Sequence, residues 1–126
     1  MADTAWLKLT IGMLGGDRRE QEIARLAAAT GAAVRAHGFP WPESGIPGVA
    51  YLDDPAAVLK GARFALFPIP GIAANGALFA PAAPAPIIPT RAMLAGMPPL
   101  AHIVLGWADR NLKANADALG IKLHEY

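Results

Sequence analysis

The stretch that most constrains the fold lies at residues 9–30, where a short apolar run passes through a glycine pair into a helical pattern. Residues 9–14 read LTIGML, Gly15 and Gly16 follow, and apolar residues then recur at helical spacing. A buried strand that turns tightly into an amphipathic helix is typical of the first βα unit of a parallel sheet. The glycine pair permits the tight turn and leaves room for a ligand near the start of the helix.

The helical part of this stretch carries a start signal and an apolar face. Asp17 is a favourable N-cap residue, and Glu20 three positions later completes a capping-box pattern. Ile23, Leu26 and Ala27 recur at helical spacing, which predicts that they form the apolar face of the helix. We therefore expect an amphipathic helix that starts next to the glycine turn.

Strand and helix patterns alternate along the rest of the chain. The predicted strands span residues 9–14, 32–36, 49–52, 64–67, 87–88, 101–105 and 121–124, and the predicted helices span residues 18–30, 55–60, 91–95 and 110–119. Residues 64–67 are continuously apolar, which predicts a central strand buried on both faces. The sequence thus predicts one α/β domain over residues 1–126: a three-layer, open, mostly parallel sheet, Rossmann-like or flavodoxin-like, with helices on both faces.

Composition and charge exclude several classes of protein. The 126 residues suffice for one core, 54% of them are hydrophobic, and the net charge is +1 with scattered Lys and Arg. Because no basic stripe occurs, we expect no nucleic-acid partner. The chain has no cysteine, no apolar run of about 20 residues for a membrane span, and no signal-peptide pattern. We expect a soluble, cytoplasmic protein without disulfides.

The first turn does not match the dinucleotide-binding fingerprint. A G-x-G-x-x-G motif that starts at Gly12 requires glycine at the positions held by Leu14 and Asp17. His37 stands where the second strand ends and an acidic ribose partner is expected. The sequence therefore predicts no nicotinamide cofactor bound by this chain.

Other catalytic and metal motifs are also incomplete. Asp53 and Asp54 follow a strand as in a response regulator, but the acidic pair and the lysine of that site are missing, so helix capping is the better interpretation. Ser44 lacks a G-x-S-x-G setting. The three histidines, His37, His102 and His124, show no metal-ligand spacing. We assign no catalytic residue and no metal ligand.

Three segments should meet at the carboxyl edge of the sheet. They are residues 15–19, 68–76 and 106–111, each of which follows a predicted strand. In open α/β sheets the ligand crevice forms at this edge. Arginines in these segments, Arg18 and Arg19 among them, could bind a carboxylate or phosphate.

With these loops placed, the chain resembles the N-terminal domain of the dipicolinate synthase A subunit. The resemblance is carried by residues 11–18 (IGMLGGDR), by residues 31–32 and 37–39, by residues 48–49, by the strand that runs into Pro68 and Gly71, by Asn75–Gly76 and by Gly106. It spans nearly the whole chain. The glycine turn at residues 15–18, in register with the turn at residues 68–71, is its most specific part.

The resemblance implies a domain of an enzyme that oxidises dihydrodipicolinate to dipicolinate for bacterial spores. It implies a second, C-terminal Rossmann domain that binds NADP and is absent here, and it implies a partner, the flavoprotein-like B subunit. The implied contacts to the small dicarboxylate substrate are Gly15, Gly16, Asp17, Arg18, Pro70, Gly71 and Gly106. The alanine-rich helices also allow a homodimer.

The chain departs from the family pattern at the later turns. Pro70 and Ile72 stand where the family usually has Ser and Thr, and Trp107 replaces a smaller residue. These changes make the expected crevice more apolar. The alternative function is a free-standing flavodoxin-like module that binds a small anion or another protein.

Overall fold

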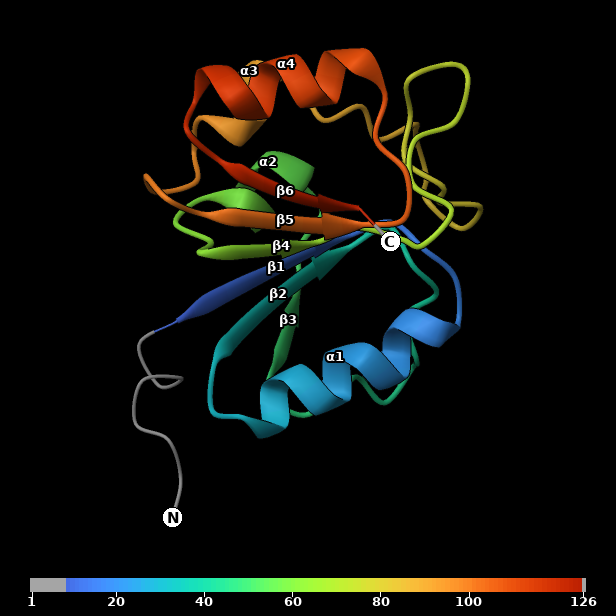
Figure 1. The fold of residues 1–126 in the computed structure, drawn as a ribbon. Coiled ribbons are helices and arrows are strands. Elements are labelled where there is room, and N and C mark those ends of the chain that lie inside the picture. The colour runs from blue at the N-terminus through green and yellow to red at the C-terminus, as the bar shows by residue number, and fades with distance from the viewer. Residues whose placement is uncertain (1–8, 126) are drawn as a thin grey trace.

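The computed structural model of the chain describes residues 9–125, which form one parallel sheet flanked by helices (Figure 1). The strands are β1 (Thr10–Leu14), β2 (Ala33–His37), β3 (Val49–Tyr51), β4 (Phe64–Leu66), β5 (His102–Leu105) and β6 (Lys122–Glu125). The helices are α1 (Arg19–Ala29), α2 (Pro55–Leu59), α3 (Arg91–Leu94) and α4 (Arg110–Ala118). The predicted α/β class is confirmed. The strand predicted at residues 87–88 is wrong, because Ile87 lies buried in a loop, where its carbonyl accepts the Leu78 N–H (2.8 Å).

The strand order is β3-β2-β1-β4-β5-β6, and every neighbouring pair is parallel. This is the Rossmann order; the flavodoxin order is 2-1-3-4-5. The register sets Gly12 of β1 opposite Arg35 of β2 and Ala65 of β4. The chain proceeds from β1 to β2 on one side and from β4 to β5 on the other, so the winding direction changes between β1 and β4.

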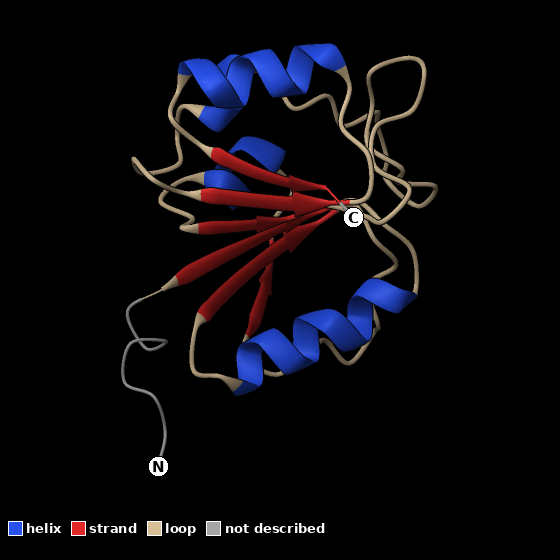
Figure 2. Ribbon diagram, viewed as in Figure 1, coloured by secondary structure: helices blue, strands red, loops and turns tan. Residues whose placement is uncertain are grey.

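Helices α2, α3 and α4 cover one face of the sheet (Figure 2). Their fully buried side chains are Val58, Leu59, Leu94, Leu112 and Ala116. Gly12 lets α2 approach β1, because a Cβ at Gly12 would lie only 2.7 Å from the Val58 carbonyl oxygen. The glycine that would begin a dinucleotide fingerprint therefore serves helix packing.

Helix α1 packs on the opposite face, against β2 and β3. Its buried residues are Glu20 and Ala24, whereas Ile23 is 40% and Leu26 is 55% exposed. The helix was predicted correctly, but the apolar set named for it is not its buried face. That set borders an apolar hollow of about 370 Å³ beside β1 and β4. The hollow is lined by Ile11, Ile23, Leu26, Ala27, Thr30, Phe64 and Leu66.

On the α1 side, none of the helices described between residues 9 and 125 covers β4, β5 and β6. The rings of Phe64, His102 and His124 lie side by side across these strands, with centroids 5.2 and 5.3 Å apart. Phe64 and Leu66 are only half-buried. The prediction that residues 64–67 are buried on both faces is therefore wrong, because one side of β4 lacks a covering layer.

The start of α2 gives a direct test of capping. Asp54 accepts a hydrogen bond from the Ala56 N–H (3.0 Å), whereas its neighbour Asp53 has no side-chain partner among the described residues. We expect Asp54→Ala to lower the free energy of unfolding by about 1 kcal/mol, because an N-terminal donor of the helix loses its acceptor. Asp53→Ala is the matched control and should change it by less than about 0.5 kcal/mol. Equal losses for the two variants in urea unfolding would contradict this assignment.

Candidate functional site

The carboxyl ends of β1 and β4 meet where the winding direction changes. Ligands of open α/β sheets bind in the crevice at such a point. The turns that follow β1, β4 and β5, at residues 15–17, 67–71 and 106–109, lie at this edge, and the long loop of residues 71–89 gathers there as well (Figure 1). We call these three turns the switch edge.

Phe79 joins the turns of the switch edge through its backbone. The Gly16 N–H donates to the Phe79 carbonyl (2.6 Å), and the Phe79 N–H donates to the Gly71 carbonyl (2.9 Å). The Ile72 N–H donates to the Trp107 carbonyl (2.9 Å), which ties in the turn after β5. The predicted convergence of the three segments at one edge is confirmed. Phe79 was not predicted, because it lies in a loop without periodicity.

The glycines of the switch edge allow close backbone contacts. A Cβ at Gly71 would lie 2.1 Å from the Trp107 carbonyl oxygen, and one at Gly106 would lie 1.3 Å from the Ile69 carbonyl oxygen. Gly15 and Gly16 have positive φ angles of 75° and 105°, which favour glycine. These four residues shape the edge.

The backbone donors of these glycines are already engaged. The Gly15 N–H donates to the His37 carbonyl (2.9 Å), and the N–H groups of Gly71 and Gly106 both donate to the Pro68 carbonyl (2.9 and 3.3 Å). Gly16 donates to Phe79, as described above. An acid at this edge would therefore be bound through side chains rather than through these four N–H groups.

Three charged residues at the start of α1 hydrogen-bond to one another: Asp17, Arg19 and Glu20. The Asp17 carboxylate accepts hydrogen bonds from the Arg19 backbone N–H (3.0 Å) and from its guanidinium (2.9 Å). The Glu20 carboxylate accepts the Asp17 N–H (2.6 Å), as the capping-box pattern predicts, but the helix begins at Arg19 and its N-cap is Arg18, so the prediction of Asp17 as the N-cap is wrong by one residue. The Arg19 hydrogen bond lowers the pKa of Asp17 to about 2, and burial raises the pKa of Glu20. Arg19 is thus committed to Asp17 and is not a free donor for a ligand.

Arg18 and Arg110 remain as unpaired cations beside the switch edge. Neither side chain makes a hydrogen bond or an ion pair with another residue of the described part of the chain. Arg18 precedes α1 and lines a hollow of about 290 Å³ between that helix and residues 45–47. Arg110 is the first residue of α4. Each can donate two hydrogen bonds to one carboxylate.

The switch edge also exposes apolar side chains. Ile69 is 58% exposed and Trp107 is 52% exposed, and Pro70, which follows Ile69, is exposed as well. Large apolar side chains grouped on a surface mark contact sites more often than isolated ones do. The departures from the family pattern noted in the sequence thus lie at the candidate site, except that Ile72 is buried.

His37 ends β2 at the same edge of the sheet but is held inside the fold. Its ring is buried, and Nδ1 lies 2.7 Å from the Leu52 carbonyl oxygen, which can only accept, so Nδ1 carries the proton. The next residue, Gly38, donates its N–H to the Tyr51 hydroxyl (3.1 Å). These contacts fix the end of β2 behind the first glycine turn.

The first turn does not fit a dinucleotide. A pyrophosphate would need free N–H groups at the start of α1, but those of Gly15, Gly16, Asp17 and Arg19 all have partners within the chain. The ionised Asp17 carboxylate would also repel phosphate there. Within the described residues, the first turn therefore offers no cradle for a pyrophosphate.

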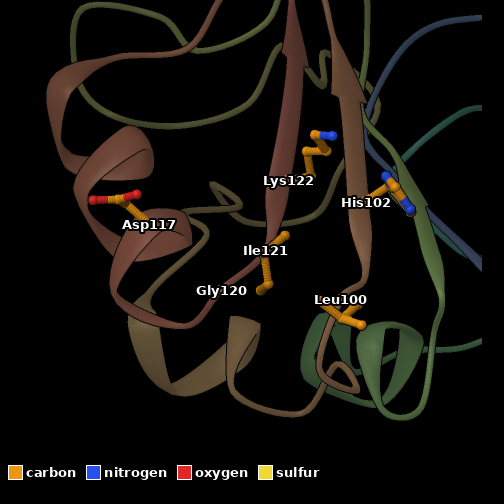
Figure 3. Close-up of a pocket in the computed structure, with 6 residues that line it drawn as sticks. All are labelled: Leu100, His102, Asp117, Gly120, Ile121 and Lys122. Atoms are coloured by element: carbon orange, nitrogen blue, oxygen red, sulfur yellow. The ribbon is translucent and has the colours of Figure 1, made fainter.

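A separate pocket of about 440 Å³ lies at the opposite, amino-terminal edge (Figure 3). It is lined by Leu100, His102, Asp117, Gly120, Ile121 and Lys122.

Between residues 9 and 125, no three His, Asp or Glu side chains come close enough to hold a metal ion. Within the same range, no helix has the length and apolar character needed to cross a bilayer.

The family model for the N-terminal domain of the dipicolinate synthase A subunit matches residues 10–126. No curated protein sequence matches the chain.

Solved structures share the fold. The A subunit of dipicolinate synthase from Bacillus halodurans has a TM-score of 0.80 at 20% identity, over 93% of this chain and 40% of that one. The corresponding chain of dipicolinate synthase from Bacillus subtilis has a TM-score of 0.78 at 21% identity, over 93% and 39%. D-lactate dehydrogenase with NAD+ from Lactobacillus jensenii has a TM-score of 0.64 at 20% identity, over 91% and 33%. The chain thus spans 40% or less of the length of each of these proteins.

Proposed function

Since the chain belongs to the family of N-terminal domains of the dipicolinate synthase A subunit, we propose that it is the substrate-holding domain of a dehydrogenase that oxidises dihydrodipicolinate to dipicolinate. In this proposal the switch edge binds the small dicarboxylate, and a second domain C-terminal to this one carries NADP. The longer related structures support a second domain, since they extend well beyond the part that this chain matches.

The observation that carries the proposal is the placement of an unpaired arginine beside the converging turns. Arg18 directly follows the turn at residues 15–17, and its guanidinium has no partner among the described residues. A dicarboxylate needs a cation that is not already neutralised, and the neighbouring Arg19 is neutralised by Asp17. Gly15, Gly16, Gly71 and Gly106 keep the turns close together, Pro70 borders the acid, and Asp17, ion-paired with Arg19, fixes the start of α1 beside it.

The proposed setting includes further partners. A flavoprotein-like B subunit would work with the complete enzyme, which would act in the cytoplasm of a spore-forming bacterium. A homodimer is compatible with this arrangement. The B subunit and the homodimer are proposed from the family, and a pull-down with the complete protein tests whether either one binds.

Arg18→Ala should weaken the binding of pyridine-2,6-dicarboxylate to the 126-residue chain. Loss of a charge-assisted hydrogen bond is worth about 1.5–3 kcal/mol, so the dissociation constant should rise by about 10- to 100-fold. Isothermal titration at constant ionic strength measures it. The kcat/KM of the complete enzyme should fall by a similar factor.

Lys122→Ala is the matched control for this measurement. Lys122 is exposed at the amino-terminal pocket, so its loss removes the same charge from the opposite edge of the sheet. We expect its dissociation constant to stay within about twofold of wild type. If Lys122→Ala weakens binding and Arg18→Ala does not, the acid binds at the wrong edge and the proposal fails.

A further inference from the structure

Trp107 has a fixed backbone and a free side chain. Its carbonyl accepts the Ile72 N–H (2.9 Å), and the N–H of the next residue, Ala108, donates to the Glu125 carboxylate (3.1 Å). Gly71 packs against the Trp107 backbone so closely that a Cβ there would overlap it. The indole, in contrast, is 52% exposed and has no ring contact or hydrogen bond within residues 9–125.

Trp41, in contrast to Trp107, has an indole that packs against other aromatic rings. Trp41 lies in an aromatic cluster, with its ring centroid 4.9 Å from that of Tyr51 and 6.1 Å from that of Phe39. No such neighbours surround Trp107 in the described part of the chain. Trp107 therefore contributes a large apolar surface to the switch edge without stabilising the core.

We infer that Trp107 determines specificity at the switch edge, where its indole stacks on the flat ring of a cyclic dicarboxylate. This inference depends on the proposed function and names the ring as the feature that is recognised. A flat aromatic ring can lie offset against the face of the indole, which is a favourable arrangement for a pair of aromatic rings. The exposed Ile69 and Pro70 extend the apolar surface on which the ring would lie.

The stack favours an aromatic ring over a puckered one. A saturated ring presents axial hydrogens, which hold the indole away, whereas an aromatic ring lies flat against it. The proposed reaction converts a partly saturated ring into an aromatic one. Contact with Trp107 therefore strengthens toward the product-like geometry, which is the direction that assists the reaction.

A pair of ligands isolates this effect from charge. Benzene-1,3-dicarboxylate and cis-cyclohexane-1,3-dicarboxylate have the same carbon skeleton and the same charge when ionised, and they differ in the aromatic, flat character of the ring. The wild-type chain should bind the flat ligand about three- to tenfold more tightly. Trp107→Ala should bring this ratio to about one, and Trp107→Phe should retain part of it. Arg18→Ala should weaken both ligands equally and leave the ratio unchanged.

The indole N–H resonance of Trp107 gives an independent readout. It is identified by its loss in Trp107→Phe, and it should shift when the flat ligand is added but not with the saturated one. The resonance of Trp41 serves as the control and should stay in place, because its ring is packed against Phe39 and Tyr51.

The outcomes separate the two proposals. A preference for the flat ligand that survives Trp107→Ala overturns the role of Trp107. If Arg18→Ala still weakens both ligands in that case, the proposed function stands. If the wild-type chain binds neither diacid, both proposals are wrong. If Trp107→Ala instead weakens association with the second domain and leaves the ratio intact, the indole belongs to a domain interface, which also overturns the inference.

Discussion

Gly106→Ala should destabilise the chain by more than about 3 kcal/mol, one of the largest effects that we expect from a single added methyl group. The new Cβ would lie 1.3 Å from the Ile69 carbonyl oxygen and 2.4 Å from its carbonyl carbon. A backbone carbonyl cannot rotate away as a side chain can, so the turns after β4 and β5 must separate. The same separation would stretch the hydrogen bond from the Gly106 N–H to the Pro68 carbonyl (3.3 Å).

Gly96→Ala is the matched control, because neither glycine has a positive φ. The nearest atom to a Cβ at Gly96 is the Met93 carbonyl oxygen at 3.3 Å, so a shift of a few tenths of an ångström suffices. We expect a change below about 1 kcal/mol for this variant. Urea unfolding followed by circular dichroism measures both. A loss at Gly106 no larger than that at Gly96 would show that the turns of the switch edge are not in contact.

Most of the fold could be predicted from local patterns. Mostly apolar segments identified β1, β2 and β5, and Asp54 accepts a hydrogen bond from the Ala56 N–H at the start of α2, as the capping interpretation predicts. Residues 87–88 were misassigned because two isoleucines carry no periodicity and fit a buried loop equally well. The helical spacing of apolar residues predicted α1 but not the face that it buries. That face depends on which strands the helix packs against, here β2 and β3, and the sequence pattern of the helix does not show this.

The meeting of the turns at the candidate site was predicted, but its hydrogen bonds and ion pairs were not. Parallel neighbours end at one edge, so turns after β1 and β4 had to meet, and the hydrogen bonds through Phe79 confirm that they do. The sequence could not show that the N–H groups of Gly15, Gly16 and Gly106 were already engaged, because their acceptors lie in distant segments. It also could not show that Arg19 pairs with Asp17 while Arg18 remains unpaired.

The two faces of β5 should respond very differently to truncation. Ile103 is fully buried beneath α2, α3 and α4, whereas the next residue, Val104, lies half-buried on the side of the sheet where, among residues 9–125, α1 is the one helix. Ile103→Ala removes three carbons from a closed core and should lower the free energy of unfolding by about 2–5 kcal/mol. Val104→Ala removes two carbons from a surface that water already reaches, so we expect a loss below about 1 kcal/mol.

The loss in the free energy of unfolding, divided by the number of carbons removed, shows whether the uncovered side of β4, β5 and β6 is exposed to water in solution. Urea unfolding of both variants at low protein concentration should give a much smaller loss per carbon for Val104. If the two losses per carbon agree, something covers β4, β5 and β6 in solution, and the half-buried state of Phe64, Leu66 and Val104 does not describe the chain as it exists there. A loss at Val104 that grows with protein concentration would identify that cover as a second copy of the chain, because only association depends on concentration.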